Sequence, residues 1–151
     1  MLQVAAAVHK SKLLILADQG EVFQEGLTDR NQATVAAEIK GLAAYHQLLR
    51  RSGGDDAEHE QTLLRLGAAV ELLLDGKPIT PLPAEGAEHE EARGDKLGDA
   101  ANKARELAIV KRIVTRGKSA VLVLGGGHDI TEAIRPTGWG YVRVTPKGYP
   151  Q

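Results

Sequence analysis

Several kinds of residue are rare or missing in this chain of 151 residues, and each absence narrows what the protein can be. Cysteine is absent, which excludes disulfides, thiolate catalysis and Cys-ligated zinc sites. Aromatic residues are scarce, with one Phe, one Trp and three Tyr, so the core has to be built from Leu, Val, Ile and Ala. A core of this kind suits helices packed on a short sheet better than an aromatic-rich β-sandwich.

An excess of one charge and a long apolar run are missing as well. The chain has 19 Lys and Arg against 20 Asp and Glu, and the two signs are interleaved along it. This leaves no basic surface for nucleic acid or for an anionic membrane. No run of about 18 apolar residues occurs, so we expect no transmembrane helix. Together these absences predict a cytoplasmic protein that binds neither nucleic acid nor a membrane.

The residues that are present predict an α/β fold, because helical and strand-like apolar patterns alternate along the chain. The elements expected within a single domain over 1–151 are a helix over 2–18, a strand over 21–24, a helix from Thr28 or Asp29 to Arg51, a helix over 57–74, a loop or linker over 77–98, a helix over 99–116, a strand over 119–124, a short helix over 130–135 and a strand over 141–145. The two helices within 29–75 are expected to form an antiparallel hairpin.

The strand predicted over 119–124 is a continuous aliphatic run, which is typical of a strand covered on both faces. A central strand of this kind needs a neighbour on each side, whereas the chain offers only two other strands, both short. Exposed sheet edges are a liability that proteins usually avoid. We therefore expect a small, mainly parallel sheet of about three strands covered by helices. It is expected to be an incomplete version of a larger parent domain, which a second copy or a partner chain completes.

The turn after this strand, Gly125-Gly126-Gly127-His128-Asp129, is the most informative feature for function. In open α/β sheets, ligands gather beyond the carboxyl ends of the strands. Three glycines let the backbone approach a ligand closely, so Gly125, Gly126 and Gly127 are candidate cofactor-binding residues. His128 is suited to ligating a metal, acting as a general base or holding a substrate oxygen, and Asp129 is suited to orienting its ring.

A simpler interpretation of the same turn stays open. Glycine-rich turns after strands often serve only tight packing, and Asp129 is also suited to capping the short helix that follows. The glycines match neither the G-x-G-x-x-G dinucleotide fingerprint nor a P-loop, which requires Gly-Lys-Ser/Thr. Nucleotide binding by either of these routes is therefore not expected.

Two segments carry a resemblance to a known family. The chain has Arg105 near the start of a predicted helix, then the strand containing 121–124, and then the turn over 125–128, twenty positions after Arg105. This order resembles the C-terminal part of the TIKI/TraB/ChaN/erythromycin-esterase-like superfamily. The segment 22–27 also looks like an early strand of that superfamily that ends in a carboxylate, the place that Glu25 would fill.

The resemblance implies metal-dependent hydrolysis, as in some members, or haem- or iron-related binding, as in others. It places Glu25, Arg105, His128 and Asp129 in a catalytic site, and it makes His128 and Glu25 the candidate ligands of a divalent metal. The superfamily's first G-x-x-H strand has no counterpart in this sequence, which agrees with the incomplete sheet argued above. We therefore expect either a shortened homologue or a fragment of a longer chain, in which half of the site is absent.

Elsewhere in the chain, two acidic stretches, 55–60 and 85–91, each contain a histidine. Carboxylates and imidazoles can bind divalent metals, but runs of charge are usually solvated faces, so we expect structural or solvated roles here. His9 and His46 lie within predicted helices and are expected at the surface or at its boundary. Trp139 is expected to pack against neighbouring side chains.

Two functions are consistent with these patterns. One is a shortened metal-dependent hydrolase of the named superfamily, with its site at Glu25, Arg105, His128 and Asp129. The other is a non-catalytic interaction or assembly module that completes its sheet as a homo-oligomer or with a partner chain. Substrate and metal identity are left open by the sequence.

Overall fold

The computed structural model describes residues 2–87, 98–117, 119–125 and 127–146, and every structural statement below concerns these residues. Their contacts divide the chain into two compact units. The helical unit takes in the described parts of 1–21, 34–81 and 145–151, and the sheet unit takes in those of 22–33 and 82–144. Each unit has an apolar core of its own, which is the physical basis of the division.

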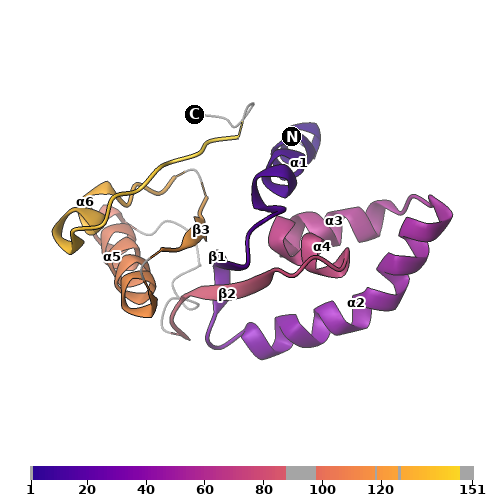
Figure 1. Ribbon diagram of the computed structural model, residues 1–151, viewed down its shortest axis with the longest axis horizontal. Helices are drawn as coiled ribbons and strands as arrows, with labels where there is room; N and C mark the ends of the chain where they lie inside the picture. The colour runs from indigo at the N-terminus through magenta and orange to yellow at the C-terminus, as the bar shows by residue number, and fades with distance from the viewer. Residues whose placement is uncertain (1, 88–97, 118, 126, 147–151) are drawn as a thin grey trace. The chain divides into compact units, whose positions relative to one another are not determined.

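The helical unit is built from α1 (Leu2–Leu16), most of α2 (Gln32–Ser52), α3 (Ala57–Leu66) and α4 (Ala68–Leu74) (Figure 1). Its core joins α3 and α4 to one face of α2, and α1 packs against α3 and α4. The side chains in this core are Leu63, Leu66, Val70 and Leu74, with Val35, Ile39, Leu42 and Ala43 packed against them.

The helix predicted over 57–74 is divided in two at Gly67. Gly67 has φ 95°, a left-handed value that glycine adopts without the steric penalty paid by other residues. Its N–H still donates to the Leu63 carbonyl at 2.8 Å, which ends α3, and α4 begins at the next residue. At the other end of α3, the Asp56 side chain caps the helix by accepting from the N–H groups of Glu58 and His59.

The sheet unit contains a three-stranded parallel sheet in the order β2-β1-β3, so the predicted α/β fold class is confirmed. Its elements are most of β1 (Glu21–Thr28) and of β2 (Thr80–Glu85), α5 (Asp99–Arg116), β3 (Val121–Val123), α6 (Thr131–Ile134) and the 3₁₀ turn η3 (Arg135–Thr137). In the register between β1 and β3, Val22 lies opposite Val121 and Gln24 opposite Val123.

The core of the sheet unit lies between the sheet and α5. Ile109 and Ile113, one turn apart on α5, pack against Phe23 of β1 and against Leu82 and Ala84 of β2. Residues four apart project from the same side of a helix, which explains why these two positions share one buried face. The side chains packed around this core are Leu122, Leu124 and Trp139.

Two of the predicted strand assignments were wrong. The segment 77–98, predicted to be loop, contains β2, because its prolines are compatible with a strand at the edge of a sheet. The segment 141–145, predicted to be a strand, is in no strand, and its alternating side chains are exposed instead of paired. β3 is an edge strand with half-buried side chains, so the predicted central position belongs to β1.

The described helices include none that is both long and apolar enough to span a membrane, in agreement with the sequence.

Candidate functional site

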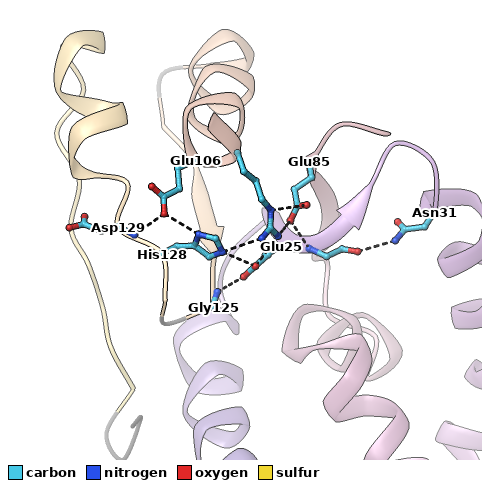
Figure 2. Close-up of polar contacts among 9 residues, drawn as sticks. Glu25, Asn31, Glu85, Glu106, Gly125, His128 and Asp129 are labelled. Carbon is cyan, nitrogen blue, oxygen red and sulfur yellow. Dashed lines mark hydrogen bonds and ion pairs between the residues drawn. The ribbon is translucent and has the colours of Figure 1, made fainter. Parts of the chain in front are cut away.

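Polar side chains meet where the three strands of the sheet unit end (Figure 2). Glu25 lies on β1 level with the residue that follows β3, Glu85 is the last residue of β2, and Gly125 begins the turn after β3. Arg105 and Glu106 reach this place from α5. The carboxyl ends of parallel strands are where loops and side chains converge in α/β proteins, and the sequence placed the site here for that reason.

Arg105 and Glu85 form the most deeply buried ion pair of the site. Arg105 donates from Nη2 to Glu85 Oε1 at 2.6 Å and from Nε to Glu85 Oε2 at 3.3 Å. Glu85 is 1% exposed and Arg105 is 9% exposed. Glu85 also accepts the Gly26 N–H at 3.2 Å, which links the last residue of β2 to the middle of β1. Two parallel bonds to one carboxylate fix the guanidinium in a single orientation.

Glu25 is the second carboxylate held by this guanidinium. Arg105 Nη2 donates to Glu25 Oε1 at 2.9 Å, and the Gly125 N–H donates to Glu25 Oε2. A Cβ atom at position 125 would lie 3.0 Å from Glu25 Oε2, closer than side chains normally approach. A side chain at position 125 would therefore require this carboxylate to move by a few tenths of an ångström.

The His128 ring lies between two carboxylates. Its Nε2 is 3.0 Å from Glu25 Oε1 and its Nδ1 is 3.1 Å from Glu106 Oε1 (Figure 2). Glu106 Oε1 also accepts the Asp129 N–H at 3.2 Å, and His128 closes the turn by donating its own N–H to the Gly125 carbonyl at 3.3 Å. The remaining guanidinium nitrogen, Nη1 of Arg105, is 3.4 Å from His128 Nε2.

These contacts limit where the ring protons can be, because carboxylates only accept hydrogen bonds. An imidazolium satisfies both Glu25 and Glu106 by donating from both ring nitrogens. A neutral ring satisfies one of them, and in that state its other nitrogen is free to accept a proton. For a ring that carries its hydrogen on Nδ1, Arg105 Nη1 is the donor that faces the bare Nε2, at 3.4 Å.

The electrostatics of the site keep Glu25 ionised. Burial raises the pKa of Glu25, but the Gly125 N–H, the His128 ring and the Arg105 charge lower it by more, so the pKa lies below its ordinary value. Burial lowers the pKa of Arg105, whereas its bonds and its attraction to Glu85 and Glu25 raise it above the usual value. Glu25 is consequently a weak base, and His128 is the better candidate for accepting a proton.

The residues do not fit the divalent metal proposed from the sequence. Within the described part of the chain, no group of three or more His, Asp or Glu side chains is placed to hold a metal ion. The atoms of His128 and Glu25 that would be ligands, Nε2 and Oε1, are both in contact with the guanidinium of Arg105. A divalent cation there would have to share these donors with a fixed positive charge, which opposes binding.

Of the candidate site residues from the sequence, Glu25, Arg105 and His128 lie together, and Asp129 contributes only its backbone N–H. The Asp129 side chain is turned away to accept from the Thr131 N–H at 3.0 Å and from the Thr131 hydroxyl, as a capping residue does. Gly125 serves Glu25, Gly127 is exposed and makes no close approach, and Gly126 lies outside the described residues.

Sequence reasoning missed Glu85 and Glu106. Glu85 opens the acidic stretch 85–91 that was predicted to be solvated, yet it is buried against Arg105. Residues 88–91 of that stretch lie outside the described residues. A signal for Glu106 was available, because Arg105 and Glu106 precede Ile109 and Ile113 by whole turns of helix and share their buried side.

Asn31 holds the end of β1 in place behind the site. Its side-chain amide donates to the Gly26 carbonyl at 2.9 Å and accepts the Thr28 N–H at 2.8 Å. The Asn31 N–H in turn donates to the Thr28 hydroxyl at 3.1 Å. These three bonds fix the backbone immediately after Glu25, which adds to the rigidity of the cluster.

Comparison of this chain with known protein families, with characterised proteins and with solved structures finds no match. The resemblance to the TIKI/TraB/ChaN/erythromycin-esterase-like superfamily therefore stays a prediction.

We expect Arg105→Met to lower the free energy of unfolding by about 3–5 kcal/mol, because it leaves Glu85 buried without its cation. The matched control is Arg112→Met on the same helix, where the partner Asp29 is exposed and the loss should be about 0–1 kcal/mol. Urea denaturation followed by circular dichroism measures both. Equal losses would show that the buried pair contributes no more to stability than the exposed pair does. Recovery of stability in the double variant Arg105→Met with Glu85→Leu would support the cost of leaving Glu85 unpaired.

We expect Glu25→Gln to reduce the acid sensitivity of stability. The pKa of Glu25 is lowered from 4.5 on folding, so its contribution is present above that pH and is lost as the pH falls through the folded value. The gap in unfolding free energy between wild type and Glu25→Gln should therefore close as the pH falls below about 4.5. Glu132→Gln, at an exposed pair with Arg135, is the control and should leave the pH profile unchanged. A constant gap across this range would contradict the role of Glu25.

Proposed function

We propose that the sheet unit carries an acid–base hydrolytic site in which His128 transfers the proton. The observation that supports this most strongly is the placement of the His128 ring between Glu25 and Glu106, with Arg105 beside its Nε2. The proposal keeps the hydrolase function that the superfamily resemblance implies and replaces its metal with an imidazole base.

The reaction would start from a His128 ring whose Nδ1–H is held by Glu106. Its Nε2 takes a proton from a water molecule, and the resulting hydroxide attacks the carbonyl carbon of an acyl substrate. The electron pair of the carbonyl moves to its oxygen, which Arg105 stabilises through Nη1. The imidazolium then returns its proton to the leaving group as the carbon–leaving-group bond breaks, and the ring is neutral again.

The charge of the site favours a neutral reacting group. Glu25, Glu85 and Glu106 contribute three negative charges and Arg105 one positive charge, so the cluster has a formal charge of −2, or −1 with an imidazolium. A phosphate ester would be repelled by this field, whereas an uncharged carboxylic ester or amide would not. We therefore propose acyl hydrolysis rather than phosphoryl transfer.

We expect His128→Gln to lower the rate of ester hydrolysis by about 10²–10⁴-fold, since that is the usual contribution of a general base. The full chain would be assayed with p-nitrophenyl acetate and p-nitrophenyl butyrate across pH 5–9. Asp129→Asn is the control next to it, and its rate should match wild type because its side chain is bonded to Thr131. A wild-type rate no faster than buffer, or an unchanged rate in His128→Gln, would reject the hydrolytic site.

A second candidate function is assembly with another copy of the chain. The segment 141–145 has the alternation of a strand, yet Tyr141, Val142 and Val144 are 40%, 88% and 61% exposed. β3 is at one edge of the sheet, and the described residues contain no strand beyond it. An exposed strand-like segment and an edge strand in the same chain support pairing between two copies.

For this second candidate, we expect wild type to be a dimer and Val142→Lys with Val144→Lys to be monomeric, as measured by light scattering after size exclusion. Lysine at an edge disfavours strand pairing. Leu14→Lys on α1, where the native side chain is 82% exposed, is the control and should not alter the mass. A monomeric wild type at all concentrations tested would exclude assembly as the function.

A further inference from the structure

We propose that the contact between His46 and His59 is an acid-sensitive joint between α2 and α3, which opens the turn end of these helices when both rings become protonated. The joint belongs to the helical unit and is independent of the hydrolytic function proposed for the sheet unit. The sequence had predicted a surface or boundary position for His46, and the structure buries it.

The two imidazoles face each other with one ring nitrogen each. His46 Nδ1 lies 2.9 Å from His59 Nε2, and the ring centroids are 5.2 Å apart. His46 is 1% exposed and His59 is 7% exposed. At this distance one of the two nitrogens must carry a hydrogen and the other must offer a lone pair.

The partner of the other His46 ring nitrogen determines whether that nitrogen carries a hydrogen. His46 Nε2 lies 2.8 Å from Asp75 Oδ1, and a carboxylate can only accept, so this nitrogen carries a hydrogen. The contact between the rings allows a single hydrogen. The pair can therefore hold hydrogens on three of its four ring nitrogens. A fourth hydrogen would make both rings cations and would point their N–H groups at each other inside the protein.

Charged groups on every neighbouring element affect how many protons this pair can hold. On its Asp75 side, Arg50 of α2 donates to Asp75 and to Glu71 of α4, and Glu71 also pairs with His9 of α1 at 2.6 Å. Asp75 favours one proton on His46, but its charge is shared with Arg50, so little of it remains to offset a second proton on the pair.

On the other side, Tyr45 of α2 bonds Asp56 at the N-cap of α3, and the rings of Tyr45 and His59 form a T-shaped contact with 5.5 Å between centroids. The exposed Glu58 follows Asp56 in the first turn of α3. The Asp56 carboxylate is bonded to Tyr45 and to backbone N–H groups, and its charge attracts His59 without a described hydrogen bond to the ring. The second proton on the pair thus has no dedicated acceptor.

The consequence for stability has a definite sign. An unfolded chain protonates both imidazoles below about pH 6.5, whereas the folded joint excludes the last proton. The unfolded state then binds more protons, so stability falls as the pH falls. One excluded proton raises the unfolding equilibrium constant by about tenfold for each pH unit below this range.

The opening is expected at the turn between the helices rather than along their whole length. His46 and His59 flank the connection between α2 and α3, while the apolar contacts of Val35, Ile39 and Leu42 lie further from it along α2. Those contacts contain no titratable group, so acid leaves them in place. The joint therefore separates the turn end of the hairpin first.

The direct test is a titration of the imidazole nitrogens by ¹⁵N–¹H NMR on the full wild-type chain from pH 8 to pH 5. We expect His46 and His59 to take up one proton together while the backbone signals of α2 and α3 stay native. Uptake of the second proton should coincide with shifts confined to the residues around 46–59. If both rings carry all four hydrogens with native backbone signals, the proposal is overturned.

A variant pair tests the same joint by thermodynamics. His59→Gln can still bond His46 Nδ1 but cannot be protonated. As the pH falls from 7.5 to 5, the unfolding equilibrium constant of this variant should therefore rise by about tenfold less per pH unit than that of wild type. His9→Gln removes a histidine whose protonated form Glu71 stabilises, so its loss in acid should be at least as large as in wild type. If the stability of His59→Gln depends on pH as that of wild type does, the proposed joint is also overturned.

Discussion

The buried bond between Arg105 and Glu85 is the interaction on which the sheet unit depends. It joins the end of β2 to the middle of α5, and through the same guanidinium it fixes Glu25 on β1. A charge buried in this way is costly unless it is paired and bonded, so the three elements have to keep a single arrangement. His128 can sit between Glu25 and Glu106 because the positions of both carboxylates are already determined by α5 and the strands.

The sequence predicted the part of this arrangement that depends on local pattern. The strand-turn-helix order around residues 119–135 follows from apolar runs and glycines, and it is confirmed. Glu25, Arg105 and His128 were named together, and they are in contact. Their chemistry could not be predicted equally well, because it depends on which further groups the fold brings to them.

The wrong predictions have a common cause, because local composition does not determine which distant segments pair. β2 contains two prolines and was predicted to be loop, whereas 141–145 alternates well and is in no strand. A strand exists where a neighbour accepts its hydrogen bonds, and β1 does so for β2. The burial of Glu85 and His46 likewise results from partners 20 and 29 residues away, Arg105 and Asp75, which no window of sequence relates to them.

The two prolines of β2 also determine in which direction the sheet can grow. Thr80 donates its N–H to the Gly20 carbonyl next to β1, and alternate residues of a strand point their N–H groups to the same side. Positions 81 and 83 therefore face away from β1, and at both of them the ring of proline replaces the N–H. The outer border of β2 therefore lacks a donor at these two positions, which disfavours another strand there and directs an added strand to the side of β3.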